Sequence, residues 1–320
     1  MAEDTGVLFG TNDDATAKSW RKKLFVDAAK EEFFGRFTNK EDTAICQQIL
    51  ELEKAHGDTI TYTLRMRGFA SGSMLESTTG ITLSGSERYG QFYSNKVAIA
   101  EVGTSTKAKS KLDLQRPVFD LRTEMSAMLK EDIADWMENK KYVAATTAPT
   151  TDHYIDLTSE SNPYFDHTTI ELMVRKAMDV SPIIRPIKWD GKEWRVIIIS
   201  KEQKKSLLAD DTFMAGWQNA GPRDKSNPIF SGADFYWDGA VIYVYERAVV
   251  MSNNEARALL LGAQSLVIAY AQAWSWLEDL TDIPKRLPVV GTDALVGVGK
   301  TAFNSEDYGI IACDTKYIPD

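Results

Sequence analysis

The sequence predicts an α+β protein, and three patterns along its 320 residues lead to this expectation. Residues 59–67 alternate apolar and polar side chains, which is typical of a half-buried β-strand. Residues 117–140 repeat apolar side chains at spacings of three and four, which is typical of an amphipathic helix. From residue 162 onward, helix-capping motifs alternate with short apolar runs, so this region is expected to contain both helices and strands.

The composition is that of an ordinary globular protein. Hydrophobic residues make up 43% of the chain and charged residues 26%, which excludes a disordered, collagen-like or coiled-coil protein. The 37 Lys+Arg and 46 Asp+Glu residues give a net charge of −9, so any contact with nucleic acid must be local. Cys46 and Cys313 form no metal-binding motif, and the acidic start of the chain has no signal-peptide pattern. We therefore expect a reduced, intracellular protein without a zinc site or a disulfide framework.

Residues 1–57 are expected to form an arm that leads into an amphipathic stretch. Residues 1–16 hold four acids and no base, whereas residues 18–36 hold six bases and three acids. This switch of sign favours either contact with a charged neighbour or polyanion, or a solvated terminus followed by a helix face.

Residues 58–105 predict two strands joined by an unusually long loop. The strands are residues 59–67 and 96–102, and the glycine- and serine-rich connection exceeds about twenty residues, which is rare in compact domains. A free loop would gain nothing from its apolar side chains, so we expect them to contact a partner surface rather than to hang in solvent. These contact candidates are Phe69, Met74, Leu75, Ile81, Leu83, Tyr89 and Phe92.

A long helix is predicted after the basic connector of residues 107–116. Pro117 lies near its start, where the missing N–H costs nothing, and the helix would run to about Lys140, roughly 35 Å at 1.5 Å per residue. Its apolar face is expected to contain Leu121, Met125, Met128, Leu129, Ile133, Trp136 and Met137. The low-complexity residues 145–154 that follow predict a linker.

The region after residue 162 contains three local signals. Thr168 and Glu171 fit a capping box that opens a helix, and Ser200 and Gln203 fit a second one directly after the buried strand of residues 194–199. Asp238 followed by Gly239 is a strong hairpin signal. The tail after residue 287 predicts short strands and turns.

Residues 258–277 are apolar over almost the length that spans a bilayer. Polar side chains such as Gln264 and Gln272 interrupt the run, and no second span accompanies it. We therefore expect a buried core helix rather than a membrane segment.

One motif resembles a nucleotide-binding site. Residues 294–301 (ALVGVGKT) fit a relaxed phosphate-binding loop, in which Lys300 would reach phosphate and Thr301 would hold magnesium. The residues after Thr301 are poor helix formers, and only nineteen remain, too few for the rest of a nucleotide-binding domain. A glycine-rich turn between strands is the expected structure.

No other group of residues predicts catalysis or cofactor binding. His56, His153 and His167 lack metal-ligand spacing and are expected at the surface. The aromatic cluster at residues 235–245 is expected to form sheet core and cross-strand pairs rather than a base-stacking platform. We expect no enzyme activity, no cofactor and no metal.

The order of these features resembles the tailed-phage major capsid protein with the Hong Kong 97-type fold, and especially the family typified by the short-tailed phage N-four. The resemblance spans about residues 35–316 and rests on the order and spacing of short motifs. These motifs are residues 57–61 (GDTIT), 121–136, 196–206, 227–233 (NPIFSGA), 259–264 (LLLGAQ) and 303–311 (FNSEDYGII).

The resemblance implies a division of the chain and a shell-forming function. The implied parts are an N-terminal arm (1–57), an extended loop (58–105), a peripheral domain with a spine helix (106–167), an axial domain (168–282) and returning peripheral strands (283–320). The implied function is self-assembly into hexamers and pentamers of an icosahedral virion shell, formed in the host cytoplasm around phage double-stranded DNA. Two alternatives stay open, namely an encapsulin-like compartment and a phosphate-loop NTPase.

The resemblance also implies partners. They are other copies of the chain, together with portal, scaffolding and decoration proteins, packaged DNA contacted without sequence specificity, and no membrane. Two local basic runs give the DNA-facing candidates. These are Lys18, Arg21, Lys22, Lys23, Lys107, Lys109 and Lys111.

Overall fold

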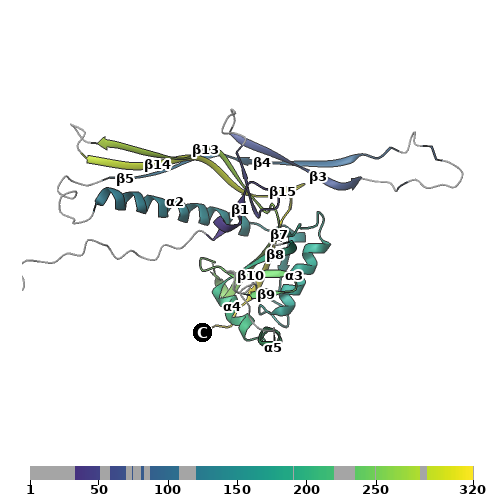
Figure 1. The fold of residues 1–320 in the computed structure, drawn as a ribbon. Helices are drawn as coiled ribbons and strands as arrows, with labels where there is room; N and C mark the ends of the chain where they lie inside the picture. The colour runs from purple at the N-terminus through teal and green to yellow at the C-terminus, as the bar shows by residue number, and fades with distance from the viewer. Residues whose placement is uncertain are drawn as a thin grey trace, which may run out of the picture. The chain divides into compact units, whose positions relative to one another are not determined.

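The computed structural model describes most of the chain from residue 33 onward (Figure 1). The described residues are 33–50, 58–69, 74, 81–82, 87–107, 120–189, 191–219, 235–248, 250–281 and 287–319. They fall into two compact units. One unit takes its described residues from Gly103–Ile133 and Trp276–Thr292, and the other takes them from Glu32–Val102, Ala134–Ser275 and Asp293–Asp320.

A five-stranded sheet contains the longest strands of the chain. Its strand order is β1 (Thr38–Asn39), β2 (Cys46–Ile49), β13 (Leu266–Thr281), β14 (Leu287–Lys300) and β5 (Ala100–Lys107). β13 runs parallel to β2, with Leu266 opposite Cys46 and Ala269 opposite Ile49. Both β13 and β14 continue from one unit into the other, because the unit boundaries fall inside these strands.

The prediction of a core helix at residues 258–277 is wrong. This run contains the end of β12 (Glu255–Leu261) and most of β13, with a turn between them in which Gln264 has a φ of 58°. Both strands are buried on two faces around Leu260 and Ile268, so their apolar residues follow one another without alternation. A doubly buried strand and a buried helix therefore have the same sequence pattern.

The long helix is confirmed as α2 (Leu121–Thr146), and it ends six residues beyond the predicted Lys140. Within the first unit, Met125 and Leu129 are buried against Val290 of β14. Met128, which the sequence placed on the apolar face, is 60% exposed. The helix therefore leaves this apolar side chain in solvent.

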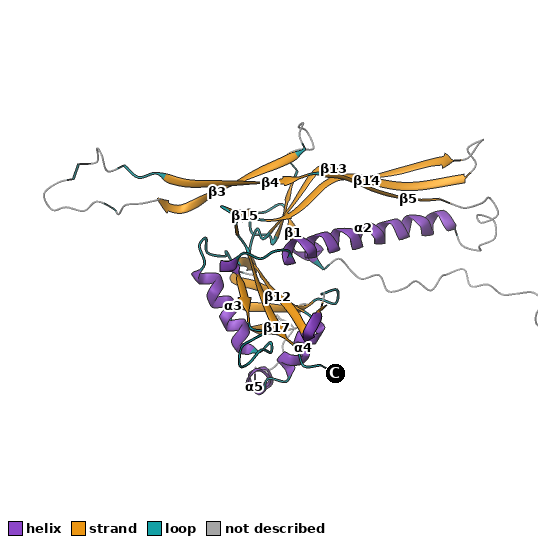
Figure 2. Cartoon of the chain, turned by 180° about the vertical axis from the view of Figure 1, so that it is seen from behind, coloured by secondary structure: helices purple, strands orange, loops and turns teal. Residues whose placement is uncertain are grey.

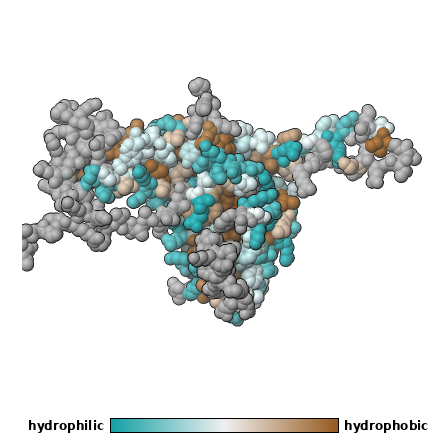
Figure 3. All heavy atoms as spheres, in the orientation of Figure 1, coloured by the Kyte–Doolittle hydropathy of each residue, from teal (hydrophilic) through white to brown (hydrophobic). Residues whose placement is uncertain are grey.

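A second, eight-stranded sheet carries the main core of the second unit. Its central strand order is β6 (Tyr154–Asp156), β17 (Ile310–Lys316), β12, β8 (Lys192–Ile199), β10 (Ala240–Val244) and β9 (Phe235–Trp237), while β11 (Val250–Met251) pairs with β12 and β7 (Ile187–Trp189) with β8. Ile197, Ile242, Leu260 and Ile311 share one face by register. Three helices contribute to the core on this face, namely α3 (His167–Asp179), α4 (Lys201–Leu208) and α5 (Asp211–Asn219). Figure 2 shows these helices beside the sheet, and Figure 3 shows mostly hydrophilic atoms over the region around α3.

Aromatic residues pack along the opposite face of this sheet. The single-turn helix η1 (Phe34–Phe37) and the preceding Phe33 bring three phenylalanine rings there. The Phe33 ring lies 5.7 Å from that of Tyr243 and 5.3 Å from that of Tyr245. The predicted role of this aromatic cluster in sheet packing is therefore confirmed.

Of the two predicted capping boxes, one is confirmed and the other is wrong. Ser200 and Gln203 form the predicted capping box of α4, with each side chain bonded to the backbone N–H of the other residue. The N-cap of α3 is instead Asp166, two residues before the expected Thr168, and its side chain accepts a hydrogen bond from the Thr169 N–H. Glu171 accepts from the indole of Trp237 rather than closing a capping box.

The Asp238–Gly239 hairpin is confirmed between β9 and β10. Asp238 and Gly239 have φ values of 44° and 73°, so both adopt the left-handed conformation that a tight two-residue hairpin requires.

The prediction of a linker at residues 145–154 is wrong. This segment contains the end of α2, the helical turn η3 (Thr151–His153) and the start of β6, which pairs with β17.

Candidate assembly surface

The predicted two-stranded loop is a β-ribbon. β3 (Thr59–Phe69) pairs antiparallel with β4 (Gly90–Ala98), placing Ile60 opposite Val97 and Leu64 opposite Tyr93. The second predicted strand, residues 96–102, is divided between the end of β4 and the start of β5. The alternation in β3 thus puts one side chain in two on each face of the ribbon.

The base of the ribbon is anchored in the body of the second unit. Ile60 and Val97 are buried in a cluster with Val267 and Ala269 of β13. Beside this cluster, the Tyr62 ring packs edge-to-face on Phe303 at 5.4 Å, and the Asn95 amide donates to the Ala302 carbonyl at 2.9 Å. β15 (Ala302–Phe303) therefore fixes the ribbon at the point where it leaves the body.

Beyond this base, the loop exposes large apolar side chains. Phe92 is 63% exposed, Tyr89 78%, Met74 83% and Ile81 52%. Phe69 lies at the end of β3 and its side chain is outside the described part, as are Leu75 and Leu83. A two-stranded sheet is marginally stable in water, and exposed aromatic side chains mark contact surfaces. These side chains form the candidate assembly surface, which we define as Met74, Ile81, Tyr89 and Phe92.

The basic candidates are mostly outside the described residues. Lys107 is exposed at the end of β5. The others lie outside the described part of the chain, and they are Lys18, Arg21, Lys22, Lys23, Lys109 and Lys111.

The phosphate-loop motif lies in a strand. Residues 294–300 belong to β14, so the expected turn is wrong and the motif does not form a loop that opens a helix. Lys300 forms an ion pair with the buried Asp307 at 2.6 Å, and its Nζ donates to the Thr147 and Ala148 carbonyls at 3.0 and 2.7 Å. This lysine connects β14 to the chain just beyond α2. Its ammonium group is bonded to acceptors of the protein itself.

His153 is buried, contrary to the surface position expected from the sequence. Its side chain is 1% exposed, and Nδ1 lies 3.2 Å from the Thr150 hydroxyl and 3.8 Å from a Glu306 carboxylate oxygen. Burial lowers the pKa of His153, while the nearby carboxylates of Asp307, Glu306 and Asp152 raise it by less. The folded protein therefore holds this imidazole in its neutral form. His167 also differs from the expectation, because it is partly buried and bonded to Asp210, whereas His56 lies outside the described residues.

Acid pH should destabilise the protein through His153. Because the folded pKa lies below the unfolded value of about 6.5, the unfolded chain binds the proton first as the pH falls. This contribution to stability is complete above pH ~6.5 and is lost below it, by at most about 1.4 kcal/mol per pH unit. Urea unfolding at pH 7.5 and 5.5 should show a smaller loss for His153→Gln than for the natural protein. Equal losses in the two proteins would show that His153 does not contribute.

A partly buried ion pair joins two strands of the second sheet to the end of α2. Arg257 of β12 makes a two-point contact with Asp314 of β17 at 2.6 and 2.7 Å and donates to the Thr146 carbonyl at 2.8 Å. The Tyr154 hydroxyl donates to the same carboxylate at 2.7 Å, and burial followed by this hydrogen bond raises the pKa of Tyr154. No local sequence pattern predicts this group, because its members are up to 168 positions apart.

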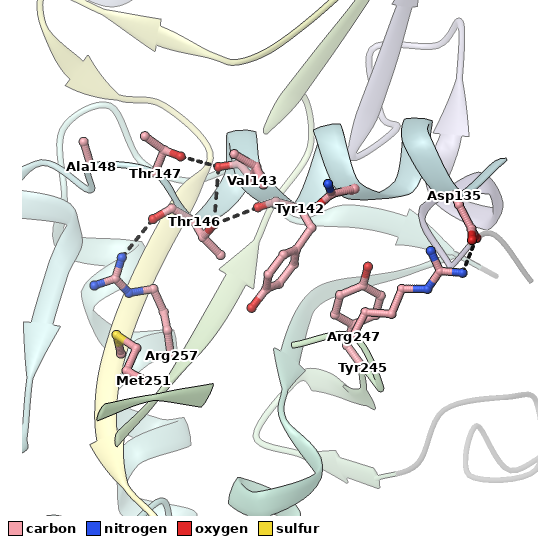
Figure 4. A pocket seen from close by; sticks show the side chains of 11 residues that line it. Asp135, Tyr142, Val143, Thr146, Thr147, Ala148, Tyr245, Arg247, Met251 and Arg257 are labelled. Atoms are coloured by element: carbon pink, nitrogen blue, oxygen red, sulfur yellow. Dashed lines mark hydrogen bonds and ion pairs between the residues drawn. The ribbon is translucent and has the colours of Figure 1, made fainter. Parts of the chain in front are cut away.

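A cavity of about 660 Å³ lies next to this ion pair (Figure 4). One wall is a face of α2 formed by Asp135, Asn139, Val143 and Thr146. The other wall consists of Tyr245, Arg247, Met251 and Arg257. Asp135 and Arg247 form an ion pair at one end of the cavity.

No cluster of three or more His, Cys, Asp or Glu side chains in the described ranges is placed to hold a metal ion. Among the same residues, no helix combines the length and apolar character needed to cross a bilayer.

Comparison with solved structures shows the Hong Kong 97-type fold. The capsid of Ralstonia phage GP4 is 23% identical in sequence, with a TM-score of 0.81 over 98% of this chain and 99% of that chain. The capsid of cyanophage Pam1 is 20% identical, with a TM-score of 0.82 over 100% of both chains. The capsid of Helicobacter pylori bacteriophage KHP30 is 14% identical, with a TM-score of 0.75 over 99% of both chains.

Sequence comparison supplies the family. No curated protein matches the chain. The family described as Phage capsid protein matches residues 8–170 and 138–317, which together cover most of the sequence. The fold and this match lead to the same conclusion, and the chain belongs to the phage capsid protein family.

Proposed function

We propose that this chain assembles with copies of itself into hexamers and pentamers of an icosahedral virion shell that encloses phage double-stranded DNA. The observation that carries the proposal is the β3–β4 ribbon, which is anchored at Ile60 and Val97 and exposes Phe92 and Tyr89 beyond the anchor. A surface of this kind is covered when it lies on a neighbouring copy, and the apolar area buried there stabilises the assembly. The chain then acts as a structural subunit rather than as an enzyme.

The same proposal assigns a role in the shell to each part of the chain. The arm (1–57) and extended loop (58–105) would contact neighbouring copies. The axial domain (168–282) would meet its equivalents at the centre of each hexamer or pentamer, and the remaining peripheral parts would form the edges. Portal, scaffolding and decoration proteins would join the shell, which would form in the host cytoplasm.

Sedimentation tests the assembly proposal. The purified full-length chain should form particles that sediment far ahead of a 35.8 kDa monomer, and their amount should rise steeply with protein concentration. A chain that sediments as a monomer at every concentration, with correct folding by circular dichroism, would contradict the proposal.

Packaged DNA should be retained less well when the basic candidates are neutralised. Replacing Lys107, Lys109 and Lys111 by glutamine removes three charges that can pair with phosphate, so the salt dependence of DNA retention should weaken by about one phosphate contact per lysine. DNA release from purified particles at increasing salt measures this effect. Retention that is unchanged at every salt concentration would exclude these lysines as DNA contacts, and Lys192→Gln, in β8, provides the matched control.

A further inference from the structure

An arginine with unused hydrogen-bond donors lines the cavity beside α2. The side chain of Arg247 is only 23% exposed, and one of its terminal nitrogens pairs with Asp135 on the α2 wall (Figure 4). A guanidinium carries five N–H donors, and within the described part of the chain that of Arg247 donates to Asp135 alone. Because a charge that is largely removed from water needs partners, these donors indicate an anionic ligand.

The two arginines of the cavity differ in how firmly their partners hold them. Arg257 donates to Asp314 through two nitrogens and to the Thr146 carbonyl through the third, and the Asp314 side chain is 8% exposed. Asp135, in contrast, is 59% exposed, and ion pairs with an exposed partner contribute little to stability. Asp135 can therefore turn into solvent and give up its place on Arg247, whereas Arg257 stays neutralised.

The rest of the lining fits the uncharged body of a small ligand. Tyr142 and Tyr245 lie 4.9 Å apart between ring centroids, and Figure 4 shows them between the two arginines. Val143 and Met251 also line the cavity, and the 47% exposed Val143 offers apolar surface to a ligand. A volume of about 660 Å³ is that of a site for one small organic molecule.

We propose that this cavity binds a small organic monocarboxylate. The ligand's carboxylate makes a two-point contact with Arg247, whose planar fork matches a carboxylate, and its aromatic or aliphatic body lies against Tyr142, Val143 and Met251. A multiply charged ligand is disfavoured because Arg247 is the one cation that can be released for it, and Asp135 lies beside it. Every lining residue belongs to the second unit, so the inference does not depend on shell formation.

Titration of unassembled full-length subunits with 4-phenylbutyrate tests this proposal. Ligand-observed NMR gives the dissociation constant, with 4-phenylbutanamide as the probe that has the same body without the charge and inorganic phosphate as the probe that has charge without the body. The carboxylate should bind at least about tenfold more tightly than either. Equal binding of the amide, tighter binding of phosphate, or no binding of 4-phenylbutyrate up to about 10 mM would overturn the proposal.

Substitutions in the cavity locate the bound carboxylate. Arg247→Gln should weaken the binding of 4-phenylbutyrate at least about tenfold and leave that of the amide unchanged. Asp135→Asn removes the competing carboxylate and should strengthen binding by about threefold or more, a gain that a misfolded variant cannot give. Unchanged affinity in Arg247→Gln, or weaker binding in Asp135→Asn, would contradict the assignment.

A matched pair of substitutions tests the position of the ligand's body. Val143→Asp puts a negative charge on the apolar wall and should weaken the binding of 4-phenylbutyrate. Met178→Asp is the control, because it makes the same change at a 51% exposed apolar side chain on α3 that does not line the cavity. Equal affinities in these two variants would exclude the wall at Val143 from the site.

Discussion

Replacing Phe92 with aspartate is expected to leave the subunit folded and to abolish shell formation. Phe92 is 63% exposed on β4, opposite Arg65, so the substitution removes no core contact of the described subunit. At an interface, however, aspartate would bury a charge where an aromatic ring belongs. A cost of about 3 kcal/mol per contact raises the concentration needed for assembly by more than about 100-fold.

The matched variants for Phe92→Asp isolate the interface. Phe92→Tyr keeps the ring and should assemble like the natural protein. The free energy of unfolding of unassembled Phe92→Asp subunits should stay within about 0.5 kcal/mol of the natural value, as at other exposed positions. Sedimentation measures assembly and urea unfolding measures stability. Normal assembly of Phe92→Asp would exclude this residue from the contact.

Gly297→Ala is expected to destabilise the subunit by more than about 3 kcal/mol. A Cβ at this position would lie 2.2 Å from the Ala98 carbonyl oxygen and 2.9 Å from the Val97 side chain, both within the second unit. Backbone atoms cannot move aside as a flexible side chain does, so β14 or the end of β4 would have to shift. The glycine is therefore needed for close strand packing rather than for phosphate binding.

Gly299→Ala provides the matched control for Gly297→Ala. Gly299 lies in the same strand and the same motif, but the nearest atom to its Cβ would be a Val97 methyl carbon at 3.3 Å. This substitution should cost less than about 1 kcal/mol, because the side chain can adjust. Urea unfolding of the two variants gives the comparison. Similar stabilities would show that the approach of Ala98 to Gly297 does not constrain the fold.

Local signals along the sequence predicted the elements that depend on neighbouring residues. Ser200 and Gln203 cap α4 through bonds three residues apart, and Asp238 and Gly239 set the hairpin through their own backbone angles. The strand alternation at residues 59–67 likewise needs only the two faces of one strand. In each case the physical cause lies within a few positions of the residues that show it.

The errors arise where distant parts of the chain decide the structure. The run at residues 258–277 forms strands because β17, β8 and β2 supply hydrogen-bonding edges that its own sequence does not show. Residues 145–154 are ordered because Asp307 accepts from the Thr150 N–H and Lys300 donates to carbonyls there, about 150 positions away. The side chains of these two segments do not reveal which distant residues will pair with them.

The assembly surface was predictable in composition but not in geometry. The exposed Met74, Ile81, Tyr89 and Phe92 agree with the apolar residues that the loop sequence singled out. The anchoring of the ribbon by Phe303 and Ala302 had no sequence signal, because these residues are more than 200 positions from Tyr62 and Asn95. Likewise, the cavity beside α2 depends on Tyr245 and Arg257, which only the fold brings to the helix.

Electron cryomicroscopy of the particles formed by the full-length chain tests the central claim most directly. The expected result is a closed shell built from sixfold and fivefold groups of subunits, in which Phe92 and Tyr89 of each ribbon lie against a neighbouring copy. A chain that stays monomeric at high concentration, or a shell in which both side chains face solvent in every subunit, would contradict the account.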